Sequence, residues 1–339
     1  MSHLYIDADV VTDMTWSYVQ ERPALKKLYE KGKVSQWNAT TDIDWTPEVN
    51  FGAPMEDGFG LAGLGIEIPD SPIHHLGEEG INQFRWEFQS WMVSQFMHGE
   101  QGALVATARL VETVPDIDSK FYAANQVADE ARHVEAYAKY LNEKLQHSYE
   151  ISKPLESLLV DIMGEKRWDI TYLGMQIMVE GLALAAFGFG NVLFHDPVIK
   201  QITDYVMRDE ARHVAFGVLS LEGIYDDMTS AELAEREEFV MEAATLMRDR
   251  FLLDEVWERM GIDVEEGRAF ANANPLMMAF RQTLFSKIVP NLNKLGLLTE
   301  RVSAHFDDLG ILALKSMKDS TADLDDDFGD DIRGDLVDA

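Results

Sequence analysis

The sequence contains no cysteine among its 339 residues. Disulfides, iron–sulfur clusters and zinc sites built on thiolates are therefore excluded, and a reducing cytoplasm fits this composition. Basic residues are also few, because 29 Lys and Arg stand against 60 Asp and Glu, which gives a formal net charge of −31. A chain this acidic repels nucleic acid and anionic membrane surfaces, so we expect neither as a partner.

Signals of export, membrane insertion and β-structure are missing as well. We find no apolar run long enough to span a bilayer, and the first residues, Met-Ser-His-Leu-Tyr-Ile-Asp-Ala-Asp, have no basic n-region. No alternating apolar pattern of useful length predicts a strand. Hydrophobic residues nonetheless make up 46% of the chain, enough for a large core. We expect an all-α cytoplasmic protein.

One pentapeptide occurs twice. Asp-Glu-Ala-Arg-His occupies residues 129–133 and, 80 residues later, residues 209–213. Another glutamate lies 30 residues before the glutamate of each copy, at Glu100 and at Glu180. On a helix, Glu and His three residues apart project from nearly the same face. Each copy therefore offers one carboxylate and one imidazole to the same site.

Turn signals lie midway between the paired glutamates. The midpoint of the first pair is Pro115, and that of the second is His195, which precedes Asp196-Pro197. Two helical hairpins that turn there bring four carboxylates and two imidazoles together inside a four-helix bundle, the arrangement of dimetal carboxylate sites. The predicted metal ligands are Glu100, Glu130, His133, Glu180, Glu210 and His213.

The remaining pattern predicts one domain over residues 1–318. Its parts are a covering segment at 1–80, with a helix at 16–31 interrupted by Pro23, a bundle core at about 81–225, and further helices at 229–318. Within these parts, the second helix is expected to begin after a cap at Asp116 or Asp118 and to end near 146. The others are expected at 81–113, 168–194, 197–225, 230–261, 264–288 and 299–317. A linker carrying Pro154 and Gly164 joins the second helix to that at 168–194, and Pro290 and Gly296 separate the last two. The Asp-rich residues 319–339 are expected to be a disordered tail.

The ligand set also predicts its supporting residues. Four carboxylates offset the charge of two divalent ions, and imidazole with carboxylate suits iron and manganese. A metal-bound histidine usually donates its other ring N–H to a carboxylate. Asp129 and Asp209 are the candidates, each paired with the histidine of the other pentapeptide. Their own arginines, Arg132 and Arg212, are expected to pair with these aspartates.

The doubled Asp-Glu-x-Arg-His with its upstream glutamates resembles the ferritin-like di-iron carboxylate superfamily. It is most similar to the hydroxylase subunits of bacterial multicomponent monooxygenases, and spacing and length also resemble the ribonucleotide reductase small subunit and its oxidase relatives. The segment from Leu28 to Trp45 is similar to the entry segment of those small subunits. Over residues 28–225 the resemblance implies a ferritin-like bundle with additional helices, two iron ions or a Mn/Fe pair, dioxygen as a reactant, and a homodimer.

Several positions can be compared with functional residues of the families that the sequence resembles. Tyr137 stands where the reductase subunit has its radical tyrosine, four residues after the first ligand histidine. No tyrosine follows Tyr225, so the tail relay of that family is missing. Leu184 replaces the threonine of the monooxygenases, and Met175 replaces the tyrosine of the oxidases with a Val–Tyr crosslink. Neither of these two features is therefore expected here.

The leading hypothesis is an enzyme that reduces dioxygen at a di-iron centre and oxidises a small, largely apolar organic substrate. Hydroxylation, N-oxygenation and desaturation share this ligand set. No flavin or nicotinamide motif is visible, so electrons must come from an external ferredoxin or reductase. The alternatives are a radical-generating subunit that uses Tyr137, and an iron-storage or metal-scavenging protein. Side chains expected to line a cavity beside the metals are Ala103, Thr107, Phe187 and Gly188.

Overall fold

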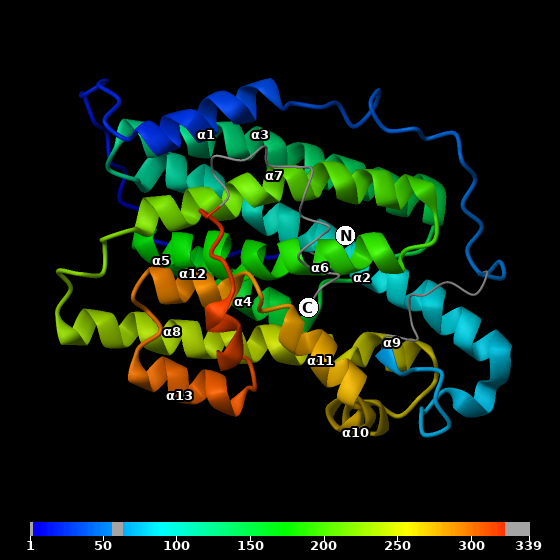
Figure 1. The fold of residues 1–339 in the computed structure, drawn as a ribbon. Helices are drawn as coiled ribbons and strands as arrows, with labels where there is room; N and C mark the ends of the chain where they lie inside the picture. The colour runs from blue at the N-terminus through cyan, green and yellow to red at the C-terminus, as the bar shows by residue number, and fades with distance from the viewer. Residues whose placement is uncertain (1–2, 56–63, 323–339) are drawn as a thin grey trace.

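The computed structural model describes residues 3–55 and 64–322, and the regular structure of these residues is helical throughout, without a strand (Figure 1). The first α-helices are α1 (Pro23–Val34), α2 (Gly77–Thr113), α3 (Ile117–Lys139), α4 (Lys153–Gly164), α5 (Trp168–Tyr172), α6 (Glu180–Leu193) and α7 (Pro197–Leu221). They are followed by α8 (Ser230–Asp249), α9 (Asp254–Arg259), α10 (Val264–Ala273), α11 (Pro275–Thr283), α12 (Ile288–Lys294) and α13 (Glu300–Asp308). The prediction of an all-α fold is confirmed.

Four long helices form the centre of the molecule. The π-helix Leu173–Val179 joins α5 to α6, so that residues 168–193 form one continuous helix. Helices α2 and α7 run in one direction, and α3 and this continuous helix run in the other (Figure 1). Helix α4 lies outside these four and carries the chain back along the bundle (Figure 1). This is the up-and-down bundle with one long crossover that defines the ferritin-like architecture.

Local capping positions both hairpin turns. Helix α2 ends at Thr113, and Asp116 accepts a hydrogen bond from the Ser119 N–H at 2.8 Å at the start of α3. Asp196 does the same for α7, accepting from the Ile199 N–H at 3.0 Å. Such caps stabilise a helix start by about 1 kcal/mol each. The turns predicted near residues 115 and 195 are confirmed.

The continuous helix Trp168–Leu193 corrects one expectation from the sequence. By length and composition it could cross a membrane, because its most apolar 18-residue window has a mean hydropathy of 1.5. However, 94% of that window is buried inside the protein. A helix that is apolar on every side belongs at the centre of a bundle, and the burial explains its composition.

The linker predicted between the second and third long helices contains a helix, α4. Pro154 lies in its first turn, where a missing N–H costs nothing, so the proline starts this helix and does not mark a loop. The N-terminal prediction was wrong in a related way. Helix α1 begins at Pro23, and residues 16–22 are not helical.

The boundaries predicted after residue 229 also need correction. The helix expected to reach 261 ends at Asp249, and Leu253 adopts a left-handed conformation (φ 64°) before α9. Pro275 starts α11 and so divides the helix expected at 264–288. Pro290 lies inside α12, not between helices. Most of the tail predicted to be disordered, residues 323–339, lies outside the described residues.

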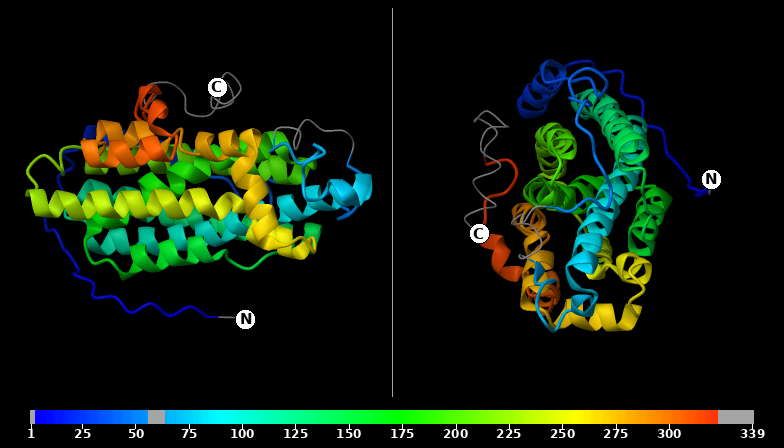
Figure 2. Two further views of the ribbon diagram at one scale, coloured as in Figure 1. Left: turned by 90° about the horizontal axis from the view of Figure 1, so that it is seen from below. Right: turned by 90° about the vertical axis from the view of Figure 1, so that its right-hand side faces the viewer.

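The added helices cover two sides of the bundle. Helix α1 packs on α3 and α7, whereas α8 packs on α4 and on the π-helix (Figures 1 and 2). Helices α9 to α11 gather near the start of α2 (Figures 1 and 2). The junction between α8 and α9 is thereby placed beside the middle of the bundle, where it supplies part of the cavity described below.

Candidate metal centre

The six predicted ligands come from all four long helices and meet in the bundle interior. Glu100 lies on α2, the first Glu-x-x-His on α3, and the second on α7. Glu180 is the first residue of α6, directly after the π-helix. None of the six is more than 5% exposed. The equal spacing of the sequence therefore brings these side chains to one height in a water-excluded site.

Their donor atoms form two groups, and within each group they lie within 4.8 Å of one another. The first group is Glu100, Glu130, His133 and Glu210, and the second is Glu130, Glu180 and His213. Glu130 belongs to both groups. That shared position is the one a carboxylate must occupy to bridge two metal ions.

Both imidazoles direct Nδ1 into the cluster. Nδ1 of His133 lies 3.1 Å from Oε2 of Glu100 and 3.2 Å from Oε1 of Glu210. Nδ1 of His213 lies 3.1 Å from Oε1 of Glu130 and also 3.1 Å from Oε1 of Glu210. Glu210 thus contacts both histidines, so it is placed, like Glu130, between the two groups.

The protonation of these carboxylates reflects their crowding. Burial, followed by repulsion from Glu210, raises the pKa of Glu100 and Glu180 well above the ordinary value. For Glu130 burial acts in the same direction, but the imidazoles, His213 foremost, hold its pKa well below the ordinary value. Oε2 of Glu130, Glu180 and Glu210 is buried without a hydrogen-bond partner.

These properties fit two divalent metal ions. Buried carboxylates are stable only when protons, hydrogen-bond donors or cations balance them. The three oxygens without a hydrogen-bond partner have lone pairs free for a metal, and the two groups combine one imidazole with three and with two carboxylates. This mixture suits iron or manganese, with zinc as a competitor. Glu100, Glu130, His133, Glu180, Glu210 and His213 can therefore hold a dimetal centre.

The two pentapeptides are linked crosswise. Nε2 of His133 lies 3.1 Å from Oδ2 of Asp209, and Nε2 of His213 lies 3.3 Å from Oδ2 of Asp129. Each aspartate thus contacts the histidine of the other copy, in the arrangement expected from the sequence. A carboxylate at Nε2 holds the ring with Nδ1 toward the cluster.

The aspartates are themselves held by cations and by an indole. Arg132 donates to Oδ1 of Asp129 at 2.6 Å, and Arg212 donates to Asp209. Trp37, just after α1, donates its Nε1–H to Oδ2 of Asp209 at 2.7 Å. Burial alone would raise the pKa of Asp209, but contacts with His133 and Arg212 hold it below its ordinary range. The covering segment therefore reaches the site through Trp37.

Sequence reasoning missed Gln126. Its Nε2 donates to Oε1 of Glu130 and to Oε1 of Glu180, each at 2.9 Å. Gln126 lies four residues before Glu130, on the same face of α3, so helical spacing was the signal that could have found it. It ties α3 to α6 at the site.

Tyr137 is fully buried one turn beyond His133. Its ring packs against Phe96 and Phe187, with centroids 5.9 and 6.2 Å away. Burial, followed by repulsion from Glu100, raises the pKa of Tyr137 well above its ordinary value. The hydroxyl is therefore neutral at physiological pH, next to an aromatic wall.

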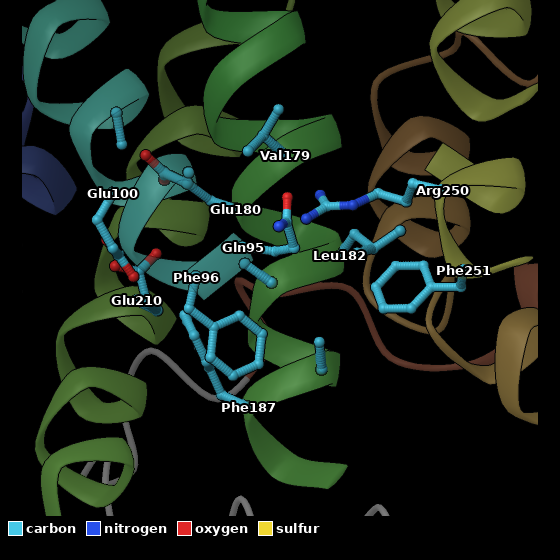
Figure 3. A pocket seen from close by; sticks show the side chains of 14 residues that line it. Gln95, Phe96, Glu100, Val179, Glu180, Leu182, Phe187, Glu210, Arg250 and Phe251 are labelled. Carbon is cyan, nitrogen blue, oxygen red and sulfur yellow. The ribbon is translucent and has the colours of Figure 1, made fainter. Parts of the chain in front are cut away.

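A cavity of about 30 Å³ opens beside the cluster (Figure 3). Its lining comprises Gln95, Phe96, Gly99, Glu100, Ala103, Val179, Glu180, Leu182, Ala183, Ala186, Phe187, Glu210, Arg250 and Phe251. Three of the six predicted ligands thus face the cavity: Glu100, Glu180 and Glu210. The remaining wall is mostly apolar.

The structure places two of the four predicted lining residues at this cavity. Ala103 and Phe187 line the cavity, whereas Thr107 and Gly188 do not. Thr107 instead accepts a hydrogen bond from Gln176 at 3.2 Å. Because α2 and α6 are antiparallel (Figure 1), the turns that follow Glu100 and Glu180 lead toward opposite ends of the bundle. Most of the cavity lining on α2 comes before Glu100 and most of that on α6 comes after Glu180, so Thr107 lies away from it.

No family model and no curated protein matches this chain. Among solved structures, a variant of the R2-like ligand-binding oxidase with an anaerobically reconstituted Mn/Fe cofactor is similar, with 18% identity, a TM-score of 0.48, and coverage of 81% of this chain and 93% of that chain. Another variant with the same cofactor has 18% identity and a TM-score of 0.43, over 83% of this chain and 94% of that chain. These values are too low to assign a cofactor or a reaction. The helix arrangement is that of a ferritin-like bundle, and its buried donor set could hold two metal ions.

Proposed function

We propose that this chain is a non-haem di-iron oxidoreductase, with a Mn/Fe pair as the alternative, that activates dioxygen and oxidises a small organic substrate. The observation that carries this proposal is the cavity, because one wall is made of Glu100, Glu180 and Glu210 and the others are mostly apolar. A storage site has no need of an apolar chamber beside its ligands. An oxygenase needs one to hold substrate and exclude water.

The chain's own residues have distinct roles in this proposal. The four glutamates and two histidines would hold the metals, which would supply binding positions for dioxygen and pass electrons to it. Asp129 and Asp209 keep the histidine rings oriented through Nε2, and Gln126 holds Glu130 and Glu180 in place. Phe96 and Phe187 give the cavity an apolar wall beside the ligands.

The balance of electrons sets what each candidate reaction must be supplied with. Inserting one oxygen atom of dioxygen into a substrate and releasing the other as water consumes two further electrons and two protons. Because no flavin or nicotinamide motif is visible, an external ferredoxin or reductase must supply them. Hydroxylation and N-oxygenation have this balance, and desaturation likewise reduces dioxygen fully to water. A cytoplasmic homodimer completes the proposal.

One observation favours a second candidate function. Tyr137 is buried beside Glu100 within an aromatic wall, a setting that would protect a tyrosyl radical. A radical-generating subunit is therefore the alternative. It would hold the same metals but require a large partner subunit as the acceptor of the radical.

The test starts from metal-free protein loaded anaerobically with Fe(II). Bound iron is counted, air-saturated buffer is added, and oxygen uptake and electron paramagnetic resonance spectra are recorded. The oxygenase is supported if the protein binds two irons per chain, takes up oxygen and shows no lasting tyrosyl signal. A lasting tyrosyl signal would contradict the oxygenase and favour the radical subunit. Binding of tens of irons per chain would contradict both functions.

A further inference from the structure

Arg250 is a buried cation whose guanidinium lies 5.2 Å from the ring centroid of Phe251 but has no hydrogen-bond acceptor among the described residues. It begins the short 3-10 helix Arg250–Leu252 after α8 and is only 8% exposed. Its Nε has no hydrogen-bond partner, and no carboxylate of the described residues lies within 4.0 Å of its guanidinium. Burial lowers the pKa of Arg250 to about 10, with Glu255 opposing the shift. The side chain therefore keeps its charge at neutral pH.

The groups around Arg250 are already engaged. Glu255 accepts a hydrogen bond from the indole N–H of Trp91 at 3.0 Å. Gln95 donates to the carbonyl of Glu150 at 2.9 Å and accepts from the N–H of Ser152 at 2.8 Å. Neither accepts a hydrogen bond from the guanidinium.

Other buried arginines do have oxygen partners. Arg212 donates to Asp209, Arg236 to both oxygens of Asp169, and Arg281 to the carbonyl of Ala271. A buried unpaired charge destabilises a fold. An anion that entered the cavity would remove this cost, and five N–H donors in a planar fork match the two oxygens of a carboxylate.

Arg250 faces the cavity opposite the cluster. Figure 3 shows its guanidinium pointing across the cavity toward Gln95 and Glu180, with Leu182 beside it. One end of the chamber is therefore cationic, and the other carries the carboxylates that would be neutralised by metals. Phe96 and Phe187 form apolar wall between and below these ends (Figure 3).

We infer that Arg250 binds the carboxylate of the substrate, which makes the substrate class small carboxylic acids with an apolar chain or ring. This inference rests on the proposed function, because it places the apolar end of the acid at the dimetal centre. The net charge of −31 repels anions at long range. Arg250 offsets this repulsion inside the cavity, because salt screens the attraction between buried charges much less than that between exposed ones. A cavity of about 30 Å³ has room for roughly two waters, so wall side chains move when the acid enters.

The experiment compares hexanoate with hexanamide, which has nearly the same shape but no charge. Isothermal titration is carried out on the anaerobic Fe(II)-loaded protein and on the metal-free protein. We expect the loaded wild type to bind hexanoate at least about tenfold more tightly than hexanamide, since charge-assisted hydrogen bonds are roughly twice as strong as neutral ones. Inorganic phosphate, which lacks the apolar chain, should bind more weakly than hexanoate.

The variants isolate the arginine. Arg250→Met should remove the preference for the acid and leave hexanamide binding within about twofold, while Arg250→Lys should retain part of the preference because a charge remains. Arg281→Met removes a buried arginine that does not line the cavity, and its preference should equal that of the wild type. Arg250→Met should unfold at no lower temperature than the wild type, because an unpaired buried charge has been removed.

Several outcomes would overturn the inference. Equal binding of acid and amide by the wild type does so without any variant. A preference that persists in Arg250→Met and requires iron would mean that the metals bind the carboxylate. Loss of iron from Arg250→Met would make Arg250 a support of the ligand cluster. Phosphate binding as tight as that of hexanoate would show a general anion site. Failure of the wild type to bind iron would instead contradict the proposed function, whatever the acid preference.

Discussion

Nε2 of His133 on α3 lies 3.1 Å from Oδ2 of Asp209 on α7, so one contact joins the two copies of the repeated pentapeptide across the bundle. The reciprocal contact, 3.3 Å long, joins His213 to Asp129. Each histidine is thus oriented by a carboxylate more than 70 residues away in sequence, and the two halves of the site depend on each other.

Asp209→Asn should weaken metal binding because the amide accepts the imidazole N–H less strongly than a carboxylate does. We expect the affinity to fall by about 10- to 100-fold. Competition with a chromophoric chelator measures this change. Asp226→Asn, at an exposed aspartate beyond the end of the same helix, is the control and should leave affinity unchanged. Equal affinities for the two variants would show that Asp209 does not support the site.

Glu180→Ala should lower the metal content without unfolding the metal-free chain. Burial, followed by repulsion from Glu210, raises the pKa of Glu180 well above the ordinary value, so its removal takes away a buried carboxyl group that costs free energy to ionise when no metal is bound. Metal analysis and thermal unfolding of metal-free protein measure the two effects, and the exposed Glu242→Ala is the matched control. Full metal content together with normal oxygen uptake would remove Glu180 from the ligand set.

Gln126→Leu should destabilise the metal-free protein by about 1–3 kcal/mol, the cost of leaving buried polar groups unpaired. The amide donates to both Glu130 and Glu180, and leucine of similar size cannot. Metal binding should stay at two ions per chain, since Gln126 is not a ligand. Urea unfolding of the metal-free protein gives the energy, and a change under about 0.5 kcal/mol, the usual range for a surface substitution, would argue against this role.

The metal-free protein should lose stability as the pH rises. Glu100 and Glu180 have raised pKa values, so they stabilise the fold when protonated, below about 4.3, and lose this contribution as they ionise. Burial opposes charge on His133 and His213, but the carboxylates still raise their pKa values. Their contribution is lost above about 6.5 in the same direction.

Thermal unfolding between about pH 6 and 9 checks this sign. The midpoint of the metal-free protein should fall as pH rises, whereas the metal-loaded protein should fall less, because metals bind the deprotonated ligands and release protons. A metal-free midpoint that climbs over this range would show that the cluster is not held by protons.

Tyr137→Phe distinguishes the two candidate functions. In an oxygenase the ring has a packing role beside Phe96 and Phe187, so the variant should keep two metals per chain and most of its oxygen uptake. In a radical subunit the variant would lose a lasting tyrosyl signal that the wild type shows. Electron paramagnetic resonance of both proteins after oxygen addition decides between them.

Local chemistry made the bundle predictable. Asp116 and Asp196 cap helices through their own neighbouring N–H groups, and Glu-x-x-His aligns two donors by helical geometry alone. The same local reasoning failed at Pro154 and Pro275, because a proline can start a helix as well as end one. Whether a proline starts a helix depends on whether the apolar face of the residues after it can pack against the rest of the protein.

The sequence by itself therefore determined the helical class, the two hairpin turns and the set of six donors, since each follows from neighbours or from one fixed spacing. Only the tertiary structure decided that Gln126 bridges two carboxylates, that Thr107 lies away from the cavity, and that Arg250 lines it without a carboxylate partner among residues 3–55 and 64–322. These last three relationships involve residues on different helices, and no fixed interval in the sequence relates those residues. They arise from how α8 and the antiparallel helices pack, and side-chain packing over long separations has no signature in a single chain.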